Sequence, residues 1–276
     1  MPRNRQEGLV AGRAGTSGAW LNAGIYGKAK TMIVLEDMET WPIEAFAPVL
    51  QYADQIRTEK ELQRCYTLEG KSWLAGMDCS RYDALLETLP ERLKEHSIKV
   101  YHCTRVTDPK AVWNTGLCPA EIEEAKARVI SALSQYLGPG EEQEIERLYD
   151  LSARRGASME RGRPLCFYTT FEQTTRYDCR TYFDYFGGSL AREALEAKRY
   201  KYYPLLRKVG IPCLVACRVK LTDGEVNQIR GLTDYMTDRL VFQGSTGLPY
   251  TARMEVAIHT PVLAQDILDV QEISLT

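Results

Sequence analysis

Long apolar runs are missing from this 276-residue chain. The longest, such as Ile211 to Cys217, fall far short of the roughly 20 residues that a transmembrane helix needs. A charged-then-apolar secretory leader is not visible at the amino end either. We therefore expect no membrane association and a cytoplasmic location, either in the producing cell or after delivery into a target cell.

The sequence also lacks the spacings that hold metals or build disulfide frameworks. Its eight cysteines are scattered, and it has only three histidines. Cys213 and Cys217 share one face of a strand-like segment, but no CxxC motif or histidine pair accompanies them. We predict free thiols in a reducing compartment, with Cys213 and Cys217 as buried structural thiols, and no bound metal.

An excess of positive charge is absent as well. Lysine and arginine number 35 against 37 acidic residues, which gives a formal net charge of -2. Neutralising a nucleic-acid backbone requires a surplus of basic residues, so the balance argues against a surface built mainly to grip nucleic acid. The content of 44% hydrophobic and 26% charged residues is ordinary for a globular protein.

Three regions differ along the chain. Residues 1–31 hold five basic residues against one acid and six of the 20 glycines, which is typical of a disordered tail or a non-native leader. Residues 32–97 show apolar side chains at helical spacing and predict a helical segment that packs on the next domain. Residues 98–276 are predicted to form that main domain.

In the main domain, strands and helices do not alternate regularly, which favours an α+β fold over a doubly wound sheet. Pro119 opens a helix that Gly138 ends, and Ser189 is the expected N-cap of a helix after a glycine pair. No internal repeat is evident. The expected strands span residues 98–103, 165–169, 211–219, 254–259 and 267–273.

The segment Val100-Tyr101-His102-Cys103-Thr104-Arg105 is the most informative in the chain, and Trp113-Asn114-Thr115-Gly116-Leu117 comes after it. It resembles the opening strand of the ADP-ribosyltransferase superfamily, in its histidine-containing, diphtheria-toxin-like and poly(ADP-ribose) polymerase-like branch. There the pattern is apolar-aromatic-His-Gly-Ser/Thr-Arg and later Gly-Leu, so Cys103 departs from the family's glycine. The resemblance implies that His102, Thr104 and Arg105 bind NAD and that the Cys103 backbone holds its carboxamide.

Strand geometry constrains how these residues act together. On a strand, His102 and Thr104 point to one face, whereas Tyr101, Cys103 and Arg105 point to the other. A nucleophile–base pair of Cys103 and His102 is therefore not expected.

Two later segments continue the resemblance. Leu165 to Thr170 resembles the family's middle motif, which leads to a helix with a nicotinamide-stacking tyrosine. Two registers are open: one aligns Cys166 with the first tyrosine and Tyr177 with the second, and the other aligns Tyr168 with the first. We predict Tyr168 and Tyr177 as the two sides of a nicotinamide clamp. As the alternative, these aromatics are only core residues.

The third segment, Met254 to His259, resembles the family's closing motif, Asn-Glu-Tyr-Ile-Val-Tyr. This match places Glu255 on the catalytic glutamate. Cleaving the nicotinamide–ribose bond passes through an oxocarbenium-like state, which a carboxylate stabilises.

The resemblance implies a split β-barrel of two small sheets with flanking helices, and NAD in the cleft between them as a substrate. His102 and Glu255 are then expected on facing walls of one pocket, as catalytic residues. The implied activity is transfer of ADP-ribose to a protein or nucleic-acid acceptor, as in a bacterial or phage toxin or defence effector. Two alternatives stay open: RNA 2′-phosphotransfer, which also consumes NAD, and a catalytically inactive relative that serves as a binding module.

Overall fold

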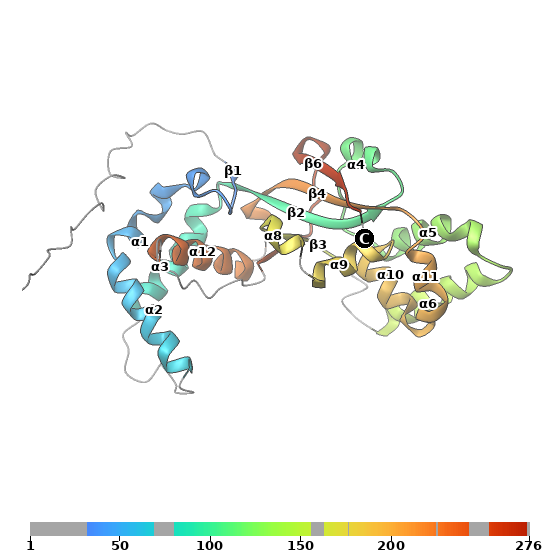
Figure 1. Cartoon of the computed structure of the whole chain (residues 1–276), viewed down its shortest axis with the longest axis horizontal. Helices are drawn as coiled ribbons and strands as arrows, with labels where there is room; N and C mark the ends of the chain where they lie inside the picture. Colours follow the sequence, from blue (N-terminus) through green and yellow to red (C-terminus); the bar gives the residue numbers. More distant parts are fainter. Residues whose placement is uncertain are drawn as a thin grey trace, which may run out of the picture.

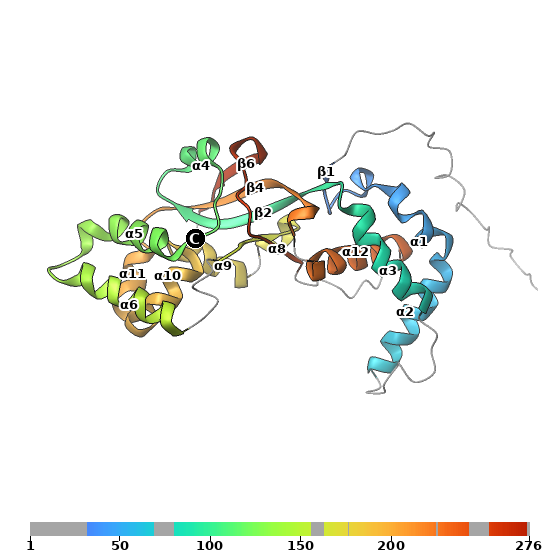
Figure 2. The ribbon, with the colours of Figure 1, turned by 180° about the vertical axis from the view of Figure 1, so that it is seen from behind.

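The computed structural model describes residues 32–68, 80–155, 163–175, 177–224, 226–242 and 254–274, and the expected tail at 1–31 lies outside them. Helices and antiparallel strands give the chain an α+β architecture, as the sequence predicts. The sheet lies in the middle of an elongated molecule, with a group of helices at each end (Figure 1). The view from behind shows the same arrangement (Figure 2).

The strands form one hydrogen-bonded sheet in the order β5-β3-β2-β4-β6, and β1 pairs in parallel with β2. All five predicted strands are confirmed. They are β2 Ser97–Val106, β3 Leu165–Tyr168, β4 Ile211–Lys220, β5 Glu255–Ile258 and β6 Ile267–Glu272, and the structure adds a short strand that was not predicted, β1 Met32–Ile33.

The strands are joined unevenly. β2 and β4 stay paired over their whole length, from Ser97 opposite Lys220 to Val106 opposite Ile211. In contrast, β2 and β3 share a single registered pair, Tyr101 opposite Tyr168. Two separate small sheets were expected, and the structure instead has one sheet with a narrow joint between β3 and β2.

The first helical group packs against one face of the sheet. Buried side chains such as Phe46 and Leu93 share one apolar cluster with Val100 of β2 and Phe167 of β3. The described helices within residues 32–97 therefore pack on the sheet, as expected. The helices of this group are α1 Ala47–Gln51, α2 Ala53–Leu68, α3 Ser80–Leu93 and, from late in the sequence, α12 Val226–Val241.

The second helical group has a core of its own. Its residues include Val129, Leu133, Tyr149 and Tyr202, all fully buried. The group consists of α5 Ile122–Leu133, α6 Glu141–Arg155, α10 Gly188–Leu195 and α11 Arg199–Leu206. Two short helices, α8 Phe171–Thr174 and α9 Tyr177–Asp184, connect it to β3, and α4 Pro109–Thr115 comes after β2.

The expected N-cap at Ser189 is wrong. The N-cap of α10 is Gly187, whose φ of 80° is left-handed. A Cβ at this position would lie 2.7 Å from Ala191 Cβ and 2.8 Å from Val129 Cγ2. The left-handed φ and the close approach of α5 and α10 therefore both favour glycine at this position.

Candidate functional site

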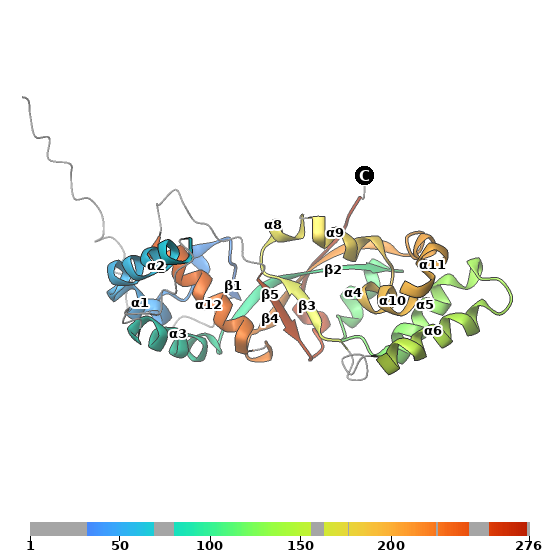
Figure 3. The same ribbon diagram turned by 90° about the horizontal axis from the view of Figure 1, so that it is seen from below.

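A row of side chains crosses three neighbouring strands and joins the three sequence motifs. Tyr101 of β2 pairs with Tyr168 of β3, and Tyr168 pairs with Glu255 of β5. Directly opposed residues of antiparallel strands point to the same face, with Cβ atoms about 5 Å apart. Segments 154 residues apart along the chain therefore meet on one face of the sheet, and Figure 3 shows β2, β3 and β5 side by side.

Glu255 is partly buried at the start of β5, and its charge acts on two tyrosine side chains, Tyr168 and Tyr182. The rings of Tyr168 and Tyr182 of α9 meet edge to face, with centroids 6.4 Å apart. Burial is the main cause that raises the pKa of Tyr182, and the negative charge of Glu255 adds to it. At neutral pH this hydroxyl keeps its proton and can donate a hydrogen bond, which suits binding more than base catalysis.

Tyr168 is held as a neutral phenol too. Burial is the main cause that raises its pKa, and its hydrogen bond with Cys179 and the charge of Glu255 make smaller contributions. Tyr182 was not predicted as a site residue, although it lies in the aromatic-dense stretch that the sequence shows before Phe186. Its contact with Tyr168 depends on how α9 packs against the sheet at β2, which no local pattern specifies.

His102 lies on the opposite face of the sheet from this row. Its Nδ1 is 2.9 Å from the carbonyl oxygen of Cys166, which can only accept, so Nδ1 carries the hydrogen. Its ring packs on Phe167, with centroids 5.5 Å apart. Burial lowers the pKa of His102 more than the Cys166 carbonyl raises it, so the ring is neutral at pH 7.

The expected facing pair of His102 and Glu255 is therefore not found. Strand alternation puts His102 on the face away from Tyr101, and Tyr101 shares its face with Glu255 through the register. Thr104 lies on the His102 side, opposite Cys213 of β4, so the structure does not bring it to Glu255 either. The sequence established the alternation within β2, whereas the register with β3 came only with the fold.

The guanidinium of Arg105 is hydrogen-bonded to main-chain carbonyl oxygens. Its Nε donates to Val209 O at 3.0 Å and its Nη1 to Phe183 O at 2.9 Å. Its Nη2 donates to Arg207 O at 2.8 Å and to Gly210 O at 2.9 Å. These bonds tie β2 to the ends of α9 and α11, so the side chain that was expected to bind NAD acts in the structure as a clamp.

Cys103 and Tyr177 complete the predicted set. Cys103 is buried with Tyr168 and Cys179, and burial raises the pKa of its thiol, with Cys179 adding to the rise. It lies on the opposite face of β2 from His102, which confirms that the two form no nucleophile–base pair. Tyr177 is the first residue of α9, but its side chain lies outside the described part of the chain.

Comparison with protein-family models, with curated proteins and with solved structures finds no match to this chain. Over the described residues, no helix combines the length and apolar character needed to cross a membrane. The same residues contain no group of three or more histidine, cysteine or acidic side chains that could hold a metal ion.

Proposed function

We propose that the chain is an ADP-ribosyltransferase-like enzyme that uses NAD as its substrate, with Glu255 as the catalytic carboxylate. The row Tyr101–Tyr168–Glu255 carries this proposal, because it unites the three motifs of the resemblance on adjacent strands. The narrow joint between β2 and β3 also fits a sheet that is close to splitting into two halves. The split-barrel fold of the superfamily is part of the proposal.

In the proposed reaction, the bond between ribose C1′ and the nicotinamide nitrogen breaks, and nicotinamide leaves with the electron pair. The ribose becomes an oxocarbenium-like cation, which the carboxylate of Glu255 stabilises. An acceptor nucleophile then attacks C1′ and loses its proton, with Glu255 in position to polarise it. Tyr168 and Tyr182 offer the aromatic walls that orient a planar leaving group.

Within this proposal, His102 positions a strand. Its Nδ1–H bond to the Cys166 carbonyl lies beside the single registered pair of β2 and β3. It therefore adds a second link at the narrow joint that sets Glu255 and Tyr168 against Tyr101.

Nicotinamide release from NAD tests the proposal. The full chain is expected to release nicotinamide, and Glu255→Gln is expected to lower the rate about 100-fold or more, since one transition-state contact of this kind is worth that much. Glu272→Gln is the matched control, because Glu272 is an exposed strand carboxylate of β6. Equal rates in the wild type and Glu255→Gln would refute the assignment of the carboxylate.

A second candidate is an inactive relative that binds a ligand without cleaving it. It is favoured by two observations: His102 faces away from the row, and Arg105 is bound to four carbonyls. NAD binding by the wild type without nicotinamide release under any acceptor condition would select it. The same use of Arg105 gives no support to RNA 2′-phosphotransfer, which needs arginines that converge on a phosphate.

A further inference from the structure

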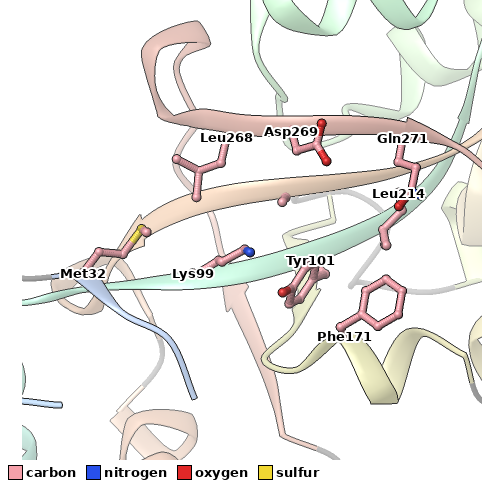
Figure 4. Close-up of a pocket in the computed structure, with 9 residues that line it drawn as sticks. Met32, Lys99, Tyr101, Phe171, Leu214, Leu268, Asp269 and Gln271 are labelled. Carbon is pink, nitrogen blue, oxygen red and sulfur yellow. The ribbon is translucent and has the colours of Figure 1, made fainter. Parts of the chain in front are cut away.

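A pocket of about 410 Å³ opens on the same face of the sheet as Glu255, beside Tyr101. The cross-strand row continues through it, since Tyr101 pairs with Ala216 of β4 and Ala216 with Asp269 of β6. The small Ala216 of β4 lies in register between Tyr101 of β2 and Asp269 of β6, and Figure 4 shows these two side chains in the pocket. The volume lies in the range of small-molecule sites.

One wall of the pocket is aromatic and accessible. Phe171 of α8 is 48% exposed, so its ring is accessible from solvent. Its ring meets Tyr101 edge to face, with centroids 6.0 Å apart. Leu214 and Leu268 extend this apolar surface on β4 and β6. A planar ring system stacks well on such a wall.

The positively charged group of the pocket and its hydrogen-bond acceptors lie on different walls. The ammonium of Lys99 lies 5.2 Å from the Tyr101 ring centroid, and no carboxylate among the described residues forms an ion pair with it. Its cross-strand neighbour Arg218 is paired with Asp266, so Lys99 is the residue of the pocket lining, within the described part of the chain, that brings a positive charge to that end. The opposite wall, on β6, offers the acceptors Asp269 and Gln271. A ligand that fits has an anionic group at one end and hydrogen-bond donors on a flat ring.

We propose that this pocket is a nucleotide-binding subsite for a nucleoside 5′-monophosphate unit. The base stacks on Phe171, its exocyclic amino group donates to Asp269, and the phosphate lies at Lys99. The unit belongs either to the adenylate half of a dinucleotide or to a separate nucleotide. The side chains that line the pocket are sufficient to bind this unit, so nucleotide binding here goes beyond the proposed cleavage of NAD and does not depend on it.

Calorimetric titration of the full chain with AMP and with adenosine tests the subsite. The wild type is expected to bind AMP more tightly than adenosine. Lys99→Met should weaken AMP about 10-fold or more and leave adenosine unchanged, because only the phosphate contact is lost. Phe171→Ala should weaken both ligands about 10-fold, because stacking is lost.

Two matched controls separate the pocket from general effects of charge and aromatic content. Tyr200→Ala removes a ring that is 85% exposed and outside the pocket, and Lys94→Met removes a surface lysine paired with Glu91. Both should bind AMP and adenosine as the wild type does. If Phe171→Ala does not fold, Phe171→Leu keeps the apolar bulk and removes only the stacking face.

Two results would overturn the subsite: no binding of AMP or adenosine by the wild type at millimolar concentration, or unchanged affinities in both pocket variants. Competition on the Glu255→Gln protein, which preserves added NAD, identifies the source of the nucleotide. Displacement of AMP by NAD assigns the pocket to the dinucleotide, and simultaneous binding assigns it to a separate nucleotide. AMP binding without nicotinamide release would reject the enzyme and keep the subsite, and the reverse would reject the subsite alone.

Discussion

Replacing Arg105 with methionine should destabilise the fold while leaving the ligand sites intact. The change removes all four hydrogen bonds from the guanidinium and keeps most of the apolar stem. Three of the four bonds are partly shielded from water, and the bond to Arg207 O is exposed. At about 1 kcal/mol for each shielded bond, the free energy of unfolding should fall by about 3 kcal/mol. For a chain of this size, that corresponds to a fall in Tm of roughly 6–12 °C.

Urea denaturation followed by circular dichroism measures this loss, with Arg218→Met as the control. The guanidinium of Arg218 pairs with Asp266 and is 44% exposed, so its removal should cost less than about 1 kcal/mol. Arg105→Lys should recover only part of the loss, because an ammonium cannot span carbonyls on two sides. A stability change below about 0.5 kcal/mol in Arg105→Met, together with a raised KM for NAD, would refute the clamp and restore Arg105 to cofactor binding.

Two further predictions concern His102 and the glycines. The pKa of His102 is lower in the folded chain than its ordinary value near 6.5, so the unfolded chain binds the proton more readily. The free energy of unfolding should therefore be unaffected above pH 6.5. It should fall as the pH drops below 6.5, by up to about 1.4 kcal/mol per pH unit. His102→Gln should flatten that slope in urea titrations between about pH 7 and 5, and an unchanged slope would exclude His102 as its source. Gly116→Ala should cost more than about 3 kcal/mol, because φ is 74° and the new Cβ would lie 2.0 Å from Val262 O. Gly140→Ala, with φ 82° and nothing within 4 Å, should cost only about 1–2 kcal/mol, and equal costs would show that the contact at Gly116 relaxes freely.

The sequence predicted most elements of the fold because their signals are local. Strand β2 shows the expected apolar pattern, and the structure has it where that pattern predicts. The stripe of Ile229, Leu232 and Met236 in α12 was readable as well, although Gly231 interrupts it and the helix was not predicted. The start of α10 could not be read locally, since Gly187 is required by a side chain of α5, Val129, far earlier in the chain.

The candidate site could be predicted only in part, and the reason is register. A strand pattern fixes which residues of β2 share a face, but one pair, Tyr101 opposite Tyr168, decides which of those faces meets Glu255. A shift by one residue would have put His102 in the row. The pairing partner lies 67 positions away, and no property of either segment alone specifies it.

The placement of His102 on the far face is compatible with cleavage of NAD for a chemical reason. The nicotinamide nitrogen already bears a positive charge in the substrate, so it becomes neutral as it leaves and needs no general acid. The reaction requires an anion near the ribose and walls that hold the ring, and Glu255 with Tyr168 and Tyr182 offers both types of group on one face. Tyr101 belongs both to this row and to the pocket beside it, two strand spacings or about 10 Å from Glu255. A dinucleotide with its nicotinamide ribose at Glu255 and its adenylate at Lys99 would therefore lie across the ring of Tyr101. A substitution of Tyr101 would test the two proposals together.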